Sequence, residues 1–275
     1  VELVPRVLPL EDEEISQTME RELKKRGVDV RTGVTVENIV RQPDVVTAHL
    51  RDGFSLNVEQ VLVSVGRGFN SRGIGLEQAG VQVGPRGEIL VNDRMETNVP
   101  GVYAIGDVVG KAMLAHVASQ QGKVAVENFM GHARSIDYDV IPTGIFTLPE
   151  IGRVGLTEQQ ARDRCLANGQ DPQQGVKVGR FRYGGLGKAQ ATGDIQGLVK
   201  VVADGTTDRI LGVHILGAHA TDLIHEAALA MHAGATVSRV AEMIHAHPTL
   251  AEGLMEAMED VHGHAIHLAR KPPSS

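Results

Sequence analysis

Hydrophobic and polar residues alternate with two different periods in the first sixty residues. At residues 12–26, apolar side chains recur every four positions among charged ones, which predicts an amphipathic helix that Gly27 ends. Short apolar runs at residues 1–4 and 28–30 flank this helix and predict a β-α-β opening. Three runs with strand-like alternation then predict a small antiparallel sheet, at residues 34–40, 45–50 and 54–58.

The next eighty residues combine buried runs with many turns. Continuous apolar runs at residues 60–65 and 102–105 predict two strands, each followed by a glycine and a charged residue. Residues 112–130 predict a long helix. The composition changes near residues 137–142, which we interpret as a domain boundary.

The last part of the chain has the pattern of an α+β domain. Thr157 and Gln160 form a capping-box signature that opens a helix, which Asn168 and Gly169 end. Strands and helices then follow, at residues 176–183, 198–202, 210–216, 220–233, 237–244 and 250–262. The pattern as a whole predicts an α/β chain, in which a partial Rossmann-like region precedes an α+β domain. Residues 271–275 predict a disordered tail.

Composition excludes several classes of protein. The 27 basic and 34 acidic side chains give a net charge of −7 without a basic block, which argues against nucleic acid as a partner. No segment approaches the roughly 20 apolar residues of a membrane span. Cys165 is the only cysteine, so the chain can form neither an intramolecular disulfide nor a cysteine-rich zinc site.

Two acidic residues lie at the ends of predicted strands. Asp107 comes after Gly106 at a strand-to-helix junction, where a carboxylate can accept hydrogen bonds from sugar hydroxyls and a helix N-terminus favours phosphate. The alternative for Asp107 is an ordinary helix cap. Glu2 lies at the end of the first strand, before a turn and a helix, where an acid in a dinucleotide fold would bind a ribose diol. The alternative for Glu2 is a solvated surface residue, which spacing alone favours.

The densest candidate for chemistry is the run His245-Ala-His247-Pro-Thr249-Leu-Ala-Glu252. Pro248 excludes a helix at His247, and Thr249 can cap the helix that follows. Glu252 would then lie in the first helical turn and could reach back to a ring nitrogen of His247. Such a pair fixes the tautomer of the imidazole and makes it a general base. The alternative is a capping arrangement with incidental histidines.

Nine of the twelve histidines, including His245 and His247, are scattered between residues 214 and 267. They lack the spacing of a recognisable ligand set with an acid or thiol, so we expect no metal site.

Three segments together resemble the pyridine nucleotide–disulfide oxidoreductases, and within that family the dihydrolipoyl dehydrogenases. They are residues 61–67 (VLVSVGR), 97–107 (TNVPGVYAIGD) and 245–252 (HAHPTLAE), in that order. The resemblance covers residues 1 to about 264 and implies a C-terminal portion of such an enzyme. It assigns residues 1–67 to an NAD-binding domain, 68–138 to a returning FAD-binding segment and 139–270 to a dimerisation domain.

The resemblance implies FAD and NAD as cofactors. Gly106 and Asp107 would bind the ribityl and pyrophosphate region of FAD, and a turn would bring backbone N–H groups to the flavin ring. That turn consists of Met113, Leu114, Ala115 and His116. Contacts to NAD would come from Glu2, Val34, Gly66 and Arg67.

The implied reaction is the oxidation of dihydrolipoyl groups, with NAD as the electron acceptor. His247 would take a proton from a dihydrolipoyl thiol, with Glu252 orienting it, and would serve the other subunit of a homodimer. The implied partners are lipoyl-bearing components of 2-oxo acid dehydrogenase or glycine cleavage systems. The implied location is the cytoplasm, or the mitochondrial matrix in a eukaryote.

The chain also departs from the family pattern. It has neither Gly-x-Gly-x-x-Gly loop and no pair of redox cysteines, so we expect a fragment that is inactive by itself. Three alternatives stay open: a non-catalytic dimerisation or scaffold module, a related flavin disulfide or mercuric reductase, and a histidine-rich metal-binding protein.

Overall fold

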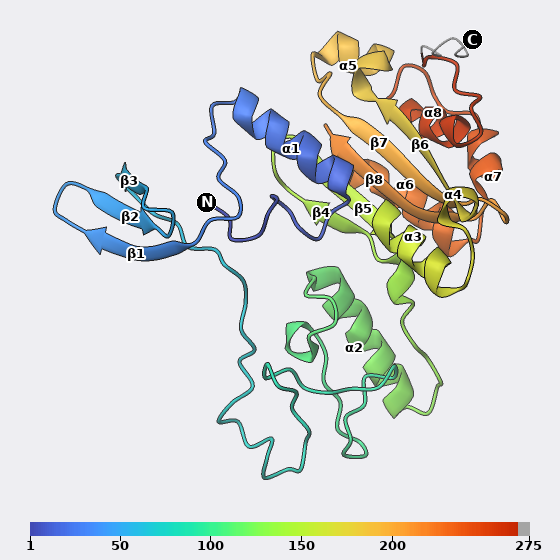
Figure 1. The fold of residues 1–275 in the computed structure, drawn as a ribbon. Helices are drawn as coiled ribbons and strands as arrows, with labels where there is room; N and C mark the ends of the chain where they lie inside the picture. The colour runs from blue at the N-terminus through green and yellow to red at the C-terminus, as the bar shows by residue number, and fades with distance from the viewer. Residues whose placement is uncertain (269–275) are drawn as a thin grey trace. The chain divides into compact units, whose positions relative to one another are not determined.

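The computed structural model describes residues 1–268 (Figure 1). The last two residues of the predicted dimerisation domain and the predicted tail, 271–275, lie outside the described residues. The chain divides into two units, each considered by itself. One unit combines Val1–Val61 with the chain from Pro142 onward, and the other is Leu62–Ile141.

A five-stranded antiparallel sheet organises the first unit. Its strand order is β4-β5-β8-β7-β6 (Figure 1). The strands are β4 (Thr143–Ile145), β5 (Glu150–Gly155), β6 (Val176–Arg182), β7 (Leu198–Asp204) and β8 (Ile210–Gly217). The two central strands β7 and β8 are buried almost throughout, because helices cover both faces of the sheet. Sequence patterns predicted β6, β7 and β8 but not the short β4 or the glycine-containing β5.

Helices cover the two faces of this sheet. On one face, α6 (Ala220–His232) packs against β5 and β8, and α8 (Glu252–Val261) packs against β6 and β7, with α7 (Val237–Ala241) beside α8. On the other face lies α1 (Glu13–Lys25), the predicted amphipathic helix. Its buried Ile15 and Met19 belong to one core cluster with Ile151, Leu198 and Leu216 of the sheet.

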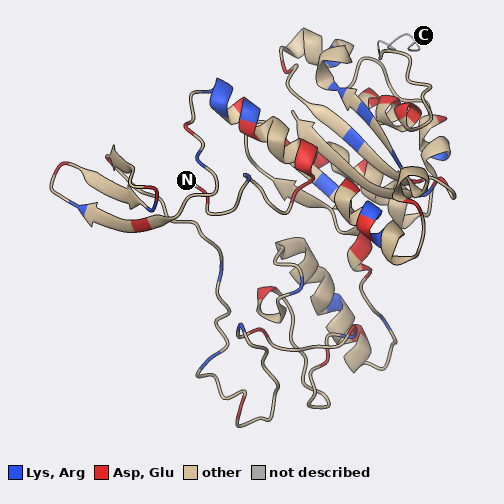
Figure 2. Cartoon of the chain, viewed as in Figure 1, with Lys and Arg blue, Asp and Glu red and all other residues tan. Residues whose placement is uncertain are grey.

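Shorter helices connect the strands. They are α3 (Glu158–Ala167), α4 (Pro172–Gly175) and α5 (Gly187–Thr192), with a 3-10 turn at Tyr183–Gly185. The predicted capping box of α3 is confirmed: Thr157 Oγ1 accepts from Gln160 N, and Gln160 Oε1 accepts from Thr157 N. Acidic and basic side chains are interspersed along α1 and α3 (Figure 2).

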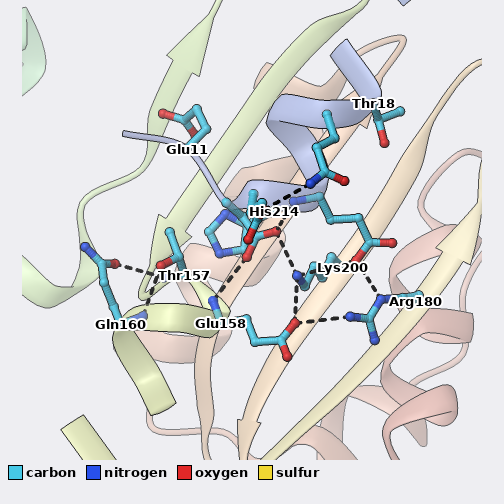
Figure 3. A network of polar contacts seen from close by, with 12 residues as sticks. Glu11, Thr18, Thr157, Glu158, Gln160, Arg180, Lys200 and His214 are labelled. Atoms are coloured by element: carbon cyan, nitrogen blue, oxygen red, sulfur yellow. Dashed lines mark hydrogen bonds and ion pairs between the residues drawn. The ribbon is translucent and has the colours of Figure 1, made fainter. Parts of the chain in front are cut away.

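A row of basic side chains crosses the sheet beneath α1. Arg153, His214, Lys200 and Arg180 stand directly opposite one another on β5, β8, β7 and β6. Acidic side chains meet this row and form a network of polar contacts (Figure 3). The acids are Glu11, Asp12 and Glu14 at the start of α1 and Glu158 at the start of α3. Charge complementarity therefore holds α1 on the sheet, in addition to apolar packing.

The predicted antiparallel meander is confirmed as a three-stranded sheet of β1 (Val36–Arg41), β2 (Val46–Leu50) and β3 (Ser55–Val58). The predicted β-α-β opening is wrong in detail. Residues 1–4 and 28–30 form no strands, and the first segment instead donates and accepts single backbone hydrogen bonds with residues 31–34.

The second unit contains one long helix, α2 (Ala115–Phe129), with 3-10 turns at Asp107–Val109 and Tyr138–Val140. One core cluster of this unit consists of Met95, Val124 and Ala125, with Val91, Tyr103 and Ile136 packed around them. The strands predicted at residues 60–65 and 102–105 are absent. Leu62 and Val65 are 92% and 93% exposed, because no strand of the described chain lies beside them to supply hydrogen bonds and cover.

Within the described part of the chain, no helix is both long and apolar enough to span a bilayer.

Candidate active site and cofactor sites

The structure brings His247 and Glu252 together. His247 lies in the irregular segment between α7 and α8, and Glu252 is the first residue of α8. His247 Nδ1 is 2.9 Å from Glu252 Oε1, which confirms the predicted contact. The predicted cap is wrong, because Ala251 takes the N-cap position of α8. Thr249 instead donates its N–H to Glu252 Oε2 at 2.9 Å and its hydroxyl to Ala246 O at 2.7 Å.

This pair has the geometry of an oriented base. When the ring is neutral, a proton on Nδ1 donated to the carboxylate leaves the lone pair on Nε2. The His247 side chain is 74% exposed, so that nitrogen is accessible in this chain. Partial burial favours the neutral form of Glu252, but hydrogen bonds from Thr249 N–H and His247 outweigh it and lower the pKa of Glu252. The carboxylate is therefore charged and able to accept the Nδ1 proton at neutral pH.

A second histidine–glutamate pair lies beside the first and was missed by sequence reasoning. His245 Nε2 is 2.8 Å from Glu226 Oε1, and the His245 side chain is only 2% exposed. Glu226 belongs to α6, 19 residues earlier in the chain. No local pattern signals a pair at this separation.

The predicted flavin-contacting residues all lie in the unit Leu62–Ile141. Gly106 takes a φ of 79°, where a side chain would be strained, and its N–H donates to Gln121 Oε1 at 2.6 Å. Asp107 is not a helix cap, since Gly106 holds the N-cap position of the 3-10 turn that follows. The Asp107 carboxylate is half exposed and pairs with Arg67 at 2.5 Å. Arg67, which the resemblance assigned to NAD, thus contacts a residue assigned to FAD.

The start of α2 lies within the predicted flavin-ring segment. Leu114 is its N-cap, an apolar residue whose side chain makes no cap hydrogen bond, and Ala115 is its first helical residue. Met113 immediately before them is 41% exposed, and His116 follows in the first turn. Backbone N–H groups at the start of a 15-residue helix attract negative charge. The predicted flavin-ring segment therefore presents suitable donors.

Glu2 and Val34 are also brought together. Val34 N donates to Glu2 O at 3.1 Å, and Glu2 N donates to Arg31 O at 2.8 Å. The Glu2 carboxylate accepts from the backbone N–H of Val4 at 3.0 Å. This hydrogen bond within the turn fixes the position of the Glu2 carboxylate. Gly66, the remaining predicted NAD residue, has a φ of 130° and lies in the other unit.

Among residues 1–268, no group of three or more His, Cys, Asp or Glu side chains is arranged to hold a metal ion.

Comparison with known proteins identifies two family domains. Residues 1–122 match the pyridine nucleotide-disulphide oxidoreductase domain, and residues 141–258 match the dimerisation domain of the same family.

Curated relatives are similar over nearly the whole chain. This chain is 44% identical to the dihydrolipoyl dehydrogenase of Thermus scotoductus, over 98% of its own length and 58% of the relative. It is 43% identical to that of Bacillus subtilis, over 97% and 56%, and 38% identical to the human mitochondrial enzyme, over 90% and 48%. The chain thus spans about half the length of the curated relatives it matches.

Solved structures show the same relationship. The HOCl-induced flavoprotein disulfide reductase RclA of Escherichia coli matches with a TM-score of 0.84 and 27% identity, over 94% of this chain and 57% of that one. LpdA of Mycobacterium tuberculosis matches with a TM-score of 0.81 and 25% identity, over 91% and 53%. These matches confirm the predicted fold class and the resemblance seen in the sequence. The chain belongs to the pyridine nucleotide-disulphide oxidoreductase family and is similar to its dihydrolipoyl dehydrogenases.

Proposed function

We propose that the protein containing this chain oxidises dihydrolipoyl groups with FAD as its cofactor and NAD as its electron acceptor. The observation that carries the proposal is the His247–Glu252 pair, at 2.9 Å, with the ring exposed. The similarity of the chain to dihydrolipoyl dehydrogenases from bacteria and from human mitochondria supports dihydrolipoyl groups as the substrate.

His247 acts as the base in this proposal. Its Nε2 takes the proton from a thiol of the dihydrolipoyl group, and the resulting thiolate is the nucleophile. Glu252 holds the Nδ1 proton and stabilises the imidazolium as it forms. Bound FAD would supply the electron transfer that links a disulfide to NAD.

The residues assigned to FAD fit an anionic, hydroxyl-bearing ligand. Asp107 presents a half-exposed carboxylate that can accept hydrogen bonds from hydroxyl groups. Gly106 has a positive φ that favours glycine, and the missing side chain lets a ligand approach the backbone closely. Backbone N–H groups at the start of α2, notably that of Ala115 after Met113 and Leu114, would hold negative charge on the flavin ring. This fit supports FAD as the cofactor.

For NAD, we propose contacts from Glu2, Val34, Gly66 and Arg67. A carboxylate at Glu2 would accept from a ribose diol and repel a 2′-phosphate, which favours NAD over NADP.

We further propose a homodimer formed through residues 139–270, with residues 1–67 belonging to the NAD domain and 68–138 to the FAD domain. The match of residues 141–258 to a dimerisation domain supports this assembly. In the dimer, His247 would serve the flavin and disulfide of the other subunit. Its partners would be lipoyl-bearing components of 2-oxo acid dehydrogenase or glycine cleavage systems, in the cytoplasm or, in a eukaryote, the mitochondrial matrix.

The reaction needs a redox-active disulfide. Cys165 is the only cysteine among these 275 residues and is buried, so the chain alone should not oxidise dihydrolipoamide. The experiment therefore uses the native protein, expressed from the complete reading frame that contains this sequence. NAD reduction by dihydrolipoamide is measured, together with the flavin content.

We expect H247Q to lower kcat by about 10²- to 10⁴-fold, the range typical of general-base removal, without loss of flavin. The matched control is H264Q. His264 is similarly exposed, but its Nδ1 lies 4.0 Å from the Glu259 carboxylate, which is too far for a hydrogen bond. Full activity in H247Q would refute the proposed base. A flavin-containing dimer that lacks the activity would favour the scaffold alternative.

A further inference from the structure

We propose that Glu226 and His245 are positioning residues for His247. They hold the segment that carries His247 against α6, while Glu252 holds it against α8. The catalytic meaning of this inference rests on the proposed function, whereas the positioning itself does not.

Both nitrogens of the His245 ring are engaged. Nδ1 lies 3.0 Å from Met243 O and Nε2 lies 2.8 Å from Glu226 Oε1. A carbonyl oxygen only accepts, so Nδ1 carries a hydrogen. The contact between Nε2 and the carboxylate then also requires a proton between them, on one partner or the other. The His245 ring is therefore held through both of its nitrogens, and its side chain is almost fully covered.

The segment between α7 and α8 has few other constraints in this chain. Ile244 is 96% exposed, and Ala246 and Pro248 are exposed as well, so apolar packing contributes little there. Within the described residues, the only hydrogen-bond partner of the His247 ring is Glu252. The position of the ring consequently depends on the backbone that carries it.

Two anchors fix that backbone, one before His247 in the sequence and one at and after it. Glu226 holds the segment two residues before His247, and Glu252 binds both the His247 ring and the N–H of Thr249 just after it. The hydrogen bond from Thr249 Oγ1 to Ala246 O closes the turn between the anchors. Removal of the Glu226 contact leaves only the anchor at α8, and a base displaced even slightly from its substrate loses much of its effect.

The first test uses NMR spectroscopy on the 275-residue chain and needs no catalysis. We expect E226A to shift the Cε1–H resonance of His247 and to lower the backbone N–H order parameters of residues 245–247 and of Thr249 from about 0.85 to below about 0.6. H245A removes the same contact from the other side and should give the same changes. E226Q should restore the wild-type values, because an amide can still hydrogen-bond the ring.

The matched control is D222N, one turn earlier on α6, where the carboxylate is 85% exposed. It should leave His247 unchanged. The inference is overturned if E226A and H245A both retain the wild-type resonance and order of His247, or if D222N alters them to the same extent.

The second test measures catalysis in the native protein. E226A should lower kcat at least tenfold with little change in KM and no loss of flavin, whereas E226Q should retain activity within about threefold of wild type. Equal losses in E226A and E226Q would contradict positioning through the hydrogen bond. If the wild-type protein does not oxidise dihydrolipoamide, the proposed function fails, and the NMR result still decides whether Glu226 positions His247.

Discussion

Lys200 Nζ lies 2.7 Å from Asp12 Oδ1, although the two residues are 188 positions apart, and their side chains are only 3% and 2% exposed. Asp12 also caps α1 by accepting from Glu14 N. One buried ion pair therefore joins the start of α1 to β7, one of the two central strands of the five-stranded sheet.

This ion pair should dominate the attachment of α1. We expect K200M to lower the free energy of unfolding by about 3 kcal/mol or more, since it leaves the buried Asp12 carboxylate without its cation. D12N should cost less, because Lys200 keeps Glu158 at 2.9 Å and Glu14 at 3.4 Å. Chemical denaturation of both single variants and of the double variant measures the coupling energy between Lys200 and Asp12. Strictly additive losses in the free energy of unfolding would contradict an interaction between them. K24M, which breaks an exposed pair, is the control and should cost less than about 1 kcal/mol.

His214 should make stability depend on pH. Burial lowers the pKa of this histidine below its ordinary 6.5, although the hydrogen bond from Nε2 to Leu156 O opposes the shift. Below pH 6.5, the unfolded chain therefore binds a proton that the folded chain excludes. The free energy of unfolding should fall with decreasing pH, by up to about 1.4 kcal/mol per unit.

H214Q keeps a donor for Leu156 O and removes the titrating group. Its stability, measured between pH 7 and 5, should lack this component of the slope. Equal slopes in the wild type and in H214Q would show that His214 does not contribute.

Glu252 should determine the tautomer of His247. In the neutral ring, the wild type should carry its proton on Nδ1, because that nitrogen faces the carboxylate at 2.9 Å. E252A removes this acceptor, and the ring should then populate the Nε2–H form as well. Nitrogen-15 NMR of the 275-residue chain distinguishes the two tautomers. E259A is the control, and an Nδ1–H tautomer that persists in E252A would contradict the assignment.

Substitution of Asp107 should weaken flavin binding with little change in stability. Because Asp107 and Arg67 are about half and two-thirds exposed, D107N should change the free energy of unfolding by less than about 1 kcal/mol. The same change should reduce the flavin bound by the native protein. D93N removes another exposed carboxylate paired with a lysine in this unit, and should leave flavin binding unchanged. Full flavin content in D107N would argue against its proposed role.

Gly179 should be intolerant of any side chain. A Cβ there would lie 2.0 Å from Ala257 O and 2.6 Å from Val261 N, both backbone atoms of α8. We expect G179A to destabilise the fold by about 3 kcal/mol, since helix and strand must separate. G184A is the control, because its nearest neighbour would be 3.9 Å away. Thermal unfolding of the two variants checks the difference.

Local patterns in the sequence were sufficient for most secondary structure. The four-residue period of α1 and the capping box of α3 need only neighbouring residues, so both could be predicted. The same holds for the contact between His247 and Glu252, because the proline between them and the helix start limit the geometry to a short turn. The residue pattern of that turn also carried the resemblance to the family.

Tertiary structure determined the strands and side-chain pairs that depend on residues far apart in the sequence. The strand predicted at residues 60–65 does not form, because a buried strand exists only when neighbouring strands bind its backbone. Residues 102–105 pair with residues 95–97 through one isolated bridge, which does not extend into a strand. No local pattern singles out Lys200 within the predicted strand 198–202 or Glu226 within the predicted helix 220–233. Their buried partners, Asp12 and His245, come from other elements of the fold, and pairing between side chains so far apart in sequence follows from packing alone.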